Sequence, residues 1–293
     1  MKIWMLLANI DDALKAVGDS LLDSRYEGVV SVPIDYIDML VDTNQQLKVY
    51  YKGKEIELPD MFWPAMTNTD LFVVEKLLIN AGVKCALNLD EVAVAKSKIA
   101  TYQRLASNGI RVPKTLVFFT HPDKNVILES FDYPFVMKPD NGFGGVGVSL
   151  IHNEAELDDY LSKQVQGVAY MAQEYISTSF GKDVRVVMLE GELYYSAMRD
   201  SNNPDEFRSN MHQGGKMKEF PIDDDTKAFC KKIASLFDLP ILGLDLLFGD
   251  GEYILVEVNA FPGMGRDFDI TYRAHKVLID GFKEKFEKES LNR

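Results

Sequence analysis

Apolar runs of strand length alternate with helical spacing along the first third of the chain. Residues 2–8 and 28–33 are apolar runs of the length of a buried strand. Residues 48–51 and 55–58 flank Lys52-Gly53-Lys54, which predicts a hairpin. Leucine and valine recur at three- and four-residue spacing over 69–81, and Gly82 follows, which predicts a helix that ends there. Because strands and helices are mixed in this way, we expect a small α/β domain over residues 1–88.

Strands become more frequent in the remainder of the chain. Ser97 is a suitable N-cap for a helix that continues to 108, and Asn153 followed by Glu156 has the capping-box pattern. Further helices are predicted at 10–23, 224–237 and 274–289, and strands at 115–119, 135–137, 148–151, 170–176, 183–189, 193–198, 243–248 and 253–259. We predict an α/β (α+β) protein whose second part divides into domains at 89–169 and 170–293.

Composition excludes several classes of partner. The 293 residues carry a net charge of −13 and no cluster of Lys and Arg, so a nucleic-acid partner is not expected. No window has the 18 or more apolar residues of a membrane span, and the first apolar run is too short for a signal peptide. The two cysteines have no metal-like spacing. We expect a cytoplasmic protein with buried thiols.

The stretch 134–147 combines a short apolar strand, a lysine and a glycine-rich loop. Lys138 ends the strand, and the loop glycines are Gly142, Gly144, Gly145 and Gly147. Glycine permits backbone amides to approach a ligand closely, and a lysine beside such amides suits a polyphosphate. A second strand follows instead of the helix of a Walker or Rossmann loop. On its own, this stretch is equally well interpreted as a flexible hairpin.

A second pattern lies near the C-terminus, where Asp250-Gly251 marks a turn between two apolar strands. A loop of three residues, 250–252, pairs Asp245 with Glu257, and Asn259 then points to the same face. Opposed carboxylates repel each other without a cation, and oxygen ligands of this kind suit Mg²⁺. The alternative is that Asp245 and Glu257 pair with basic side chains in a structural network.

Arg208 lies in a polar loop between these two patterns. Its planar cation is suited to a phosphoryl group or a developing oxyanion, although the loop alone would be interpreted as solvated. Arg185 and Arg199 are candidates for binding substrate carboxylates, or equally for structural ion pairs.

The order of these motifs resembles the ATP-grasp superfamily, and most closely its RimK-like ATP-dependent glutamate and amino-acid ligases. The resemblance covers residues 90–263 and rests on the following motifs in this order: the lysine and glycine loop, Gln173-Glu174-Tyr175-Ile176, Asp183-Val184-Arg185, Phe207-Arg208-Ser209-Asn210, Asp245, and Glu257-Val258-Asn259-Ala260-Phe261-Pro262-Gly263. It implies an ATP-grasp fold that follows the N-terminal α/β domain along the chain.

The resemblance also implies a role for each motif residue. Lys98 and Lys138 would contact the ATP phosphates, and Gly142, Gly144, Gly145 and Gly147 would close over them as a lid. Glu174, Tyr175 and Ile176 would line the adenine, and Asp183 would lie in the nucleotide pocket. The Arg208-Ser209-Asn210 segment would bind ATP, with Arg208 and Asn210 on the γ-phosphate and the acyl intermediate. Lys138, Arg208 and Asn210 would be catalytic. Asp245, Glu257 and Asn259 would bind Mg²⁺ or Mn²⁺.

The activity implied is ATP-dependent joining of a carboxylate to an amine through an acyl phosphate, with no covalent protein nucleophile. Glutamate or another amino acid would be added to a small molecule, a peptide or a protein tail. The alternatives are a peptide-modifying ligase, a kinase and a non-catalytic nucleotide-binding scaffold, and a homo-oligomer is left open. Gln213 and the run 264–269 depart from the family pattern, which leaves the acceptor undefined.

Overall fold

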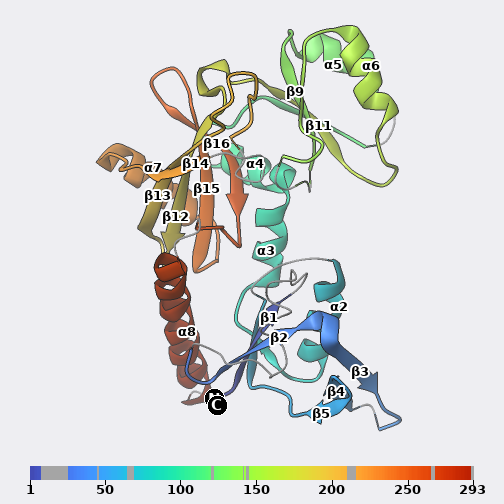
Figure 1. Ribbon diagram of the computed structural model, residues 1–293, viewed down its shortest axis with the longest axis vertical. Helices are drawn as coiled ribbons and strands as arrows, with labels where there is room; N and C mark the ends of the chain where they lie inside the picture. Colours follow the sequence, from blue (N-terminus) through green and yellow to red (C-terminus); the bar gives the residue numbers. More distant parts are fainter. Residues whose placement is uncertain are drawn as a thin grey trace. The chain divides into compact units, whose positions relative to one another are not determined.

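The computed structural model describes residues 1–7, 26–44, 46–64, 69–119, 122–140, 142, 145–209, 216–264 and 268–291 (Figure 1). The predicted helix at 10–23 lies outside these residues. The chain forms two compact units: unit 1 contains Met1–Leu89 and Asp267–Arg293, and unit 2 contains Asp90–Arg266. The further division of the second part at 169/170 stays a prediction.

Unit 1 is built on a parallel sheet with the strand order β2-β1-β6-β7. Its strands are β1 (Ile3–Leu7), β2 (Val29–Pro33), β6 (Met61–Pro64) and β7 (Lys84–Cys85). Parallel strands covered on both faces read as nearly continuous apolar runs, which explains why β1 and β2 were predictable. Trp4, Leu6, Phe62, Leu71 and Leu78 belong to the buried core on this sheet.

Unit 1 also contains a small antiparallel sheet of order β3-β4-β5. Its strands are β3 (Ile37–Val41), β4 (Leu47–Tyr51) and β5 (Lys54–Ile56), and the 3-10 turn η1 (Ile34–Tyr36) precedes them. Lys52 and Gly53 turn the β4–β5 hairpin with positive φ at both residues, as a two-residue hairpin turn requires. The predicted hairpin is confirmed here, whereas β3 and β6 were not predicted.

The described residues of unit 1 include two helices, α2 (Thr69–Asn80) and α8 (Phe268–Leu291). The sequence predicted α8 over 274–289, so the helix extends further at both ends. His275 and Phe282 of α8 lie against Trp63 of β6, with ring centroids 4.9 Å and 5.8 Å away. Both cysteines are free thiols; Cys230 of unit 2 is buried and Cys85 is half-buried.

Unit 2 begins with two helices and an antiparallel sheet of order β10-β9-β11-β8. The elements are α3 (Leu89–Lys96), α4 (Lys98–Ser107), β8 (Thr115–Phe118), α5 (Lys124–Ser130), β9 (Phe135–Pro139), β10 (Ser149–Ile151), α6 (Glu154–Ser162) and β11 (Tyr170–Glu174). Helices α5 and α6 pack on this sheet through Ile127 and Leu157 (Figure 1). Both predicted caps are confirmed: Ser97 accepts from the Ala100 amide, and Asn153 accepts from the Glu156 amide.

The second sheet of unit 2 has the order β14-β13-β12-β15-β16, and every pair in it is antiparallel. Its elements are η2 (Ser177–Ser179), β12 (Lys182–Leu189), β13 (Glu192–Asp200), β14 (Lys216–Glu219), α7 (Asp224–Ala234), β15 (Ile241–Phe248) and β16 (Tyr253–Asn259). Helix α7 packs against β12 and β13 (Figure 1). Within the described ranges, none of the helices is long and apolar enough to span a bilayer.

Candidate active site

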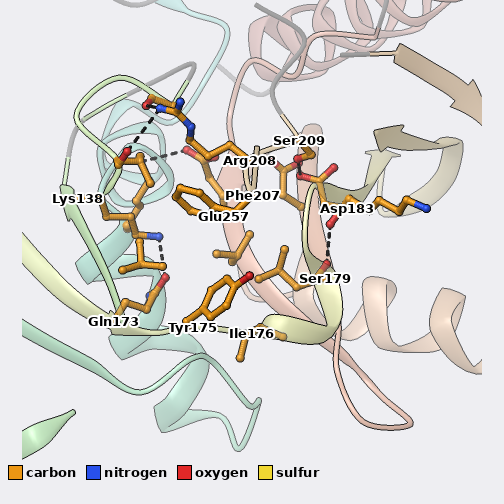
Figure 2. Close-up of a pocket in the computed structure, with 18 of the residues that line it drawn as sticks. Lys138, Gln173, Tyr175, Ile176, Ser179, Asp183, Phe207, Arg208, Ser209 and Glu257 are labelled. Carbon is orange, nitrogen blue, oxygen red and sulfur yellow. Dashed lines mark hydrogen bonds and ion pairs between the residues drawn. The ribbon is translucent and has the colours of Figure 1, made fainter. Parts of the chain in front are cut away.

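One pocket of unit 2 collects most of the sequence-predicted site residues. The pocket is partly open to solvent, and its volume with the open mouth included is about 880 Å³. The predicted residues that line it are Lys98, Lys138, Gly142, Gly145, Glu174, Tyr175, Ile176, Asp183, Arg208, Ser209, Asp245 and Glu257. Figure 2 shows Lys138 and Gln173 pointing toward each other on one side, and Asp183 with Ser209 on the other.

Lys138 is a buried cation at the end of β9. Val136 and Lys138 share one face of that strand, and Gln173 of β11 pairs with Val136, so Gln173 lies diagonally beside the lysine. Lys138 Nζ donates to Gln173 Oε1 at 2.8 Å. Burial, together with the positive charge of Lys98, lowers the pKa of Lys138 to about 7, although the nearby Glu257 and Asp140 carboxylates act in the opposite direction. A bound anion would therefore strongly stabilise the charged form of Lys138.

Lys98 is the first residue of α4 and faces the same pocket. Its Nζ donates to the carbonyl oxygens of Asp140 (3.1 Å) and Gly142 (2.8 Å), and it lies 3.1 Å from Glu257 Oε1. The Asp140 carboxylate accepts from Ser97 Oγ and from the Ile99 amide, so it binds the N-terminus of α4. The helix start and the loop after β9 are thereby joined, which fixes the position of Lys98.

The loop glycines have local structural reasons as well as the predicted one. A Cβ at position 142 would lie 2.8 Å from Pro139 Cγ and 3.2 Å from the Val146 carbonyl, so the loop closes too tightly there for a side chain. Gly145 and Gly147 have φ of +78° and +73°, which disfavours other residues. Gly147 does not line the pocket, and Gly144 lies outside the described residues.

Arg208 is held between an acidic neighbour and the glycine loop. Its Nε and Nη2 donate to the two carboxylate oxygens of Glu206 at 2.8 Å and 2.7 Å. Its Nη1 donates to the carbonyl oxygens of Gly145 (3.0 Å) and Val148 (3.4 Å). A bidentate ion pair of this kind orients the guanidinium group rigidly. Asn210, predicted to act beside Arg208, lies outside the described residues.

Four buried charged side chains form a network, and three of them, Asp183, Arg199 and Asp245, line the pocket. Strand pairing places Asp183 opposite Arg199 and Arg185 opposite Asp245, all on one face. Arg185 donates to both oxygens of Asp245, and Arg199 donates to Asp183 and, at 2.7 Å, to Asp245 Oδ2. Ser209 Oγ also donates to Asp183. The two negative and two positive charges of the network compensate each other. Arg185 and Arg199 are therefore ion-pair partners of Asp183 and Asp245 in this structure.

The pKa of Asp245 follows from this network. Burial alone would raise the pKa, but the guanidinium groups of Arg185 and Arg199 outweigh burial and hold it below its usual value. The carboxylate is therefore ionised at neutral pH. This is the arrangement that the sequence left open as the structural alternative for Asp245.

Asp245 and Glu257 pair across the hairpin of β15 and β16, as predicted, but the turn is longer than predicted and β16 contains a bulge. The turn has four residues, because Phe248 pairs with Tyr253, so the expected loop of 250–252 is wrong. Leu246 pairs with Leu255 and Asp245 with Glu257, which leaves Val256 as an extra residue in β16. This bulge restores the register that the shorter loop would have produced.

The oxygen ligands at this end of the hairpin fit a divalent cation. Glu257 and Asn259 share a face, and the Asn259 Nδ2 atom is buried with no hydrogen-bond partner among the described residues. Rotation of the side-chain amide by 180° exchanges its nitrogen and oxygen, so Asn259 can present an oxygen to a cation at this position. A carboxylate has about four acceptor positions, two on each oxygen. Hydrogen bonds from arginines occupy three of those of Asp245, so one position on Oδ1 is left for a cation.

A divalent cation would therefore be held mainly by Glu257 and Asn259. Asp245 would be a third oxygen ligand, although arginines already occupy most of its acceptor positions. Asn259 is not among the residues that line the pocket. Groups of three or more His, Cys, Asp and Glu side chains that would hold a metal without an amide are absent from the described part of the chain.

The predicted adenine segment follows β11. Tyr175 and Ile176 line the pocket, and the Tyr175 ring meets Phe207 edge to face at 6.3 Å. The Glu174 carboxylate instead accepts from the Lys114 amide and lies 3.6 Å from Arg111, so it is engaged outside the pocket. The backbone of this segment can still face a ligand, as the resemblance implies.

Several lining residues were missed by the sequence reasoning. They are Val136, Val148, Ser179, Lys182, Leu247 and Val256. Gln173 and Phe207, which also line the pocket, stand in the family motifs without an assigned role, and Arg199 was left open between binding a carboxylate and forming a structural ion pair. Two of the missed residues were predictable from strand alternation: Val136 lies two positions before Lys138, and Leu247 lies two positions after Asp245, so each points to the same face as that site residue. The apolar side chains among the lining residues, Val136, Val148, Phe207, Leu247 and Val256, suit a flat ring.

Comparisons with known proteins agree with this geometry. A family model described as the RimK-like ATP-grasp domain matches residues 95–279. The probable alpha-L-glutamate ligase of Methanococcoides burtonii is 30% identical over 229 residues, 76% of this chain and 75% of that protein. Human N-acetylaspartylglutamate synthase A is 30% identical over 204 residues, 68% of this chain and 52% of that protein.

The fold is also shared with solved structures. The D-alanine–D-alanine ligase of Bacillus anthracis in complex with ATP superposes with a TM-score of 0.68 at 17% identity, covering 98% of both chains.

Proposed function

This chain belongs to the RimK-like ATP-grasp family and is an ATP-dependent C–N ligase, and we propose that it joins the amino group of glutamate or another amino acid to a carboxylate through an acyl phosphate. The observation that carries the proposal is the convergence of Lys98, Lys138 and Arg208 on one pocket that also contains Glu257. Three cations in a pocket that also has apolar lining side chains match the chemistry of a nucleoside triphosphate.

The proposed position of the nucleotide rests on complementarity of charge and polarity. The adenine would lie against Val136, Tyr175, Ile176 and Leu247, with the triphosphate directed toward the cations. Lys98 and Arg208 presently donate to carbonyl oxygens of the glycine loop, and phosphate oxygens are stronger acceptors that would replace them. Gly142 and Gly145 permit the loop to adjust around the phosphates.

The reaction needs positioning and charge neutralisation more than covalent catalysis. A substrate carboxylate oxygen attacks the γ-phosphorus of ATP, the bond to the bridging oxygen breaks, and ADP leaves. The amine then attacks the acyl carbon, loses a proton, and inorganic phosphate departs as the amide forms. Arg208 would stabilise the equatorial oxygens of the transferring group, and Lys138 would hold the phosphates in line.

Glu257, Asn259 and the remaining acceptor position of Asp245 would hold Mg²⁺ or Mn²⁺. The bound cation would supply neutralisation of the phosphate charge. Lys98 Nζ lies 3.1 Å from Glu257 Oε1, so the lysine would orient that carboxylate.

Glutamate as the amine substrate is supported by relatives named alpha-L-glutamate ligase and N-acetylaspartylglutamate synthase A. The carboxylate donor is a small molecule, a peptide or a protein tail.

The test is a phosphate-release screen that crosses carboxylic acids and short acidic peptides with amino acids, followed by mass spectrometry of the products. We expect ADP and phosphate to appear only when a carboxylate and an amine are both present. With a carboxylate labelled by the heavy oxygen isotope, one labelled oxygen should be found in the released phosphate. Phosphorylated product without an amine would indicate a kinase, and ATP binding without turnover over the whole panel would indicate a scaffold.

A further inference from the structure

Tyr102 is a buried tyrosine of α4 whose hydroxyl contacts two parts of the site at once. It accepts a hydrogen bond from Lys138 Nζ at 3.3 Å and donates to the Val256 carbonyl oxygen at 2.5 Å. Its side chain is 5% exposed and does not line the pocket. It therefore lies behind the site and touches a cation on β9 and the bulge of β16 together.

The direction of both hydrogen bonds follows from counting donors. A tyrosine hydroxyl has a single hydrogen, and the Val256 carbonyl can only accept, so that hydrogen is given to Val256. The bond with Lys138 must then be donated by the ammonium group, which also donates to Gln173 Oε1. An ammonium group has three hydrogens, so one is left for a phosphate oxygen in the pocket.

The hydroxyl group of Tyr102 also binds Val256, the residue that determines which face of the sheet Glu257 occupies. Without the extra residue Val256, the register of Leu246 with Leu255 would continue, and Glu257 would point to the opposite face of the sheet. A bulge leaves a backbone group outside the regular ladder, and Tyr102 supplies a partner for that carbonyl.

The hydroxyl stays protonated under all ordinary conditions. Burial raises the pKa of Tyr102, and the nearby Glu257, Asp140 and Asp245 carboxylates act in the same direction. A buried hydroxyl is costly unless it is hydrogen-bonded, and here both its donor and an acceptor position are used.

We propose that Tyr102 is a positioning residue that fixes the phosphate-binding lysine Lys138 and the metal-binding end of β16 through one hydroxyl group. This inference rests on the proposed function, because it assigns Lys138 to ATP and Glu257 to the cation. It couples the two binding groups, so loss of the hydroxyl should affect nucleotide and metal together.

The first test uses the full-length protein with Tyr102→Phe, which keeps the ring and removes only the hydroxyl. Binding of a non-hydrolysable ATP analogue is measured by calorimetry, with and without Mg²⁺. We expect the Kd of the analogue to rise about tenfold, since a hydrogen bond to a charged group is lost. The Mg²⁺ concentration that gives half-maximal tightening of analogue binding should also rise.

The second test is the pH dependence of analogue binding. Lys138 is surrounded by Lys98 and Tyr102 of α4, Glu257 of β16 and Asp140 of the loop after β9. Binding that needs the charged lysine is lost as pH rises through its pKa. Because Tyr102→Phe removes an acceptor that favours the ammonium form, the midpoint of that loss should move to lower pH.

Tyr170→Phe is the matched control. Tyr170 is also buried in unit 2 and its hydroxyl accepts from the Val165 amide, away from the pocket. This variant should keep the wild-type Kd, Mg²⁺ requirement and pH midpoint. Thermal unfolding of both variants shows whether they are folded, and a merely structural role for Tyr102 would reduce the active fraction without moving these three quantities.

Wild-type values in Tyr102→Phe would overturn the inference. A wild-type protein that does not bind the analogue would instead overturn the proposed function, so the two failures are distinguishable.

Discussion

Asp245 lies directly opposite Glu257 on the β15–β16 ladder, yet each carboxylate has its own cationic partner. Asp245 is held by Arg185 and Arg199, whereas Glu257 lies 3.1 Å from Lys98. Two opposed acids would repel each other if left alone, and these basic partners remove much of that cost. Glu257, half-buried and with one cationic neighbour, is therefore the carboxylate more available to a metal.

Replacing Glu257 with alanine should reduce turnover by about a hundredfold or more, because the cation loses its main carboxylate ligand. The measurement is the initial rate of phosphate release over a range of Mg²⁺ concentrations. Glu252→Ala, in the turn of the same hairpin, removes an exposed carboxylate paired with Arg111 and should leave the rate unchanged. Near-normal activity of Glu257→Ala would contradict the metal assignment.

Arg208→Ala should lower kcat much more than it weakens ATP binding. The guanidinium group is expected to act on charge that develops during phosphoryl transfer, and loss of such a group typically costs about a hundredfold or more in rate. The Kd for ATP, measured by titration, should change by less than about tenfold. Arg111→Ala, which removes an exposed guanidinium outside the pocket, is the control. Equal losses in kcat and affinity would mean that Arg208 anchors the ground state.

His275 should make unit 1 less stable in acid. Burial lowers its pKa from 6.5 to about 4, so between these values the unfolded chain binds more protons than the folded one. Stability is then fully present above about pH 6.5 and is lost as pH falls toward 4, by about 2 kcal/mol between pH 7.5 and 5.

Tryptophan fluorescence during urea unfolding measures this effect selectively, because both tryptophans, Trp4 and Trp63, belong to unit 1. His275→Phe should remove that part of the pH dependence, whereas His152→Gln, at an exposed position in unit 2, should retain it. An unchanged pH dependence in His275→Phe would show that the histidine is not responsible.

Features that depend on neighbouring residues were predictable from the chain alone. The Ser97 cap, the Asn153 cap and the hairpin at Lys52-Gly53 follow from local hydrogen bonding and from backbone preferences. The motif order from Lys138 to Asn259 also indicated the family, because each motif carries its chemistry within a few residues. The predicted pairing of Asp245 with Glu257 was right for an incomplete reason, since a bulge at Val256 compensates for a longer turn.

Partners on separate strands and helices were decided only by the tertiary structure. The sequence left Arg185 and Arg199 open between substrate binding and ion pairing, and the sheet order settles their contacts by placing β12 between β13 and β15. Tyr102 and Val256 are 154 positions apart, and no local pattern relates them. Spacing along the chain specifies which face a side chain occupies, but burial and packing of distant elements decide what that face meets.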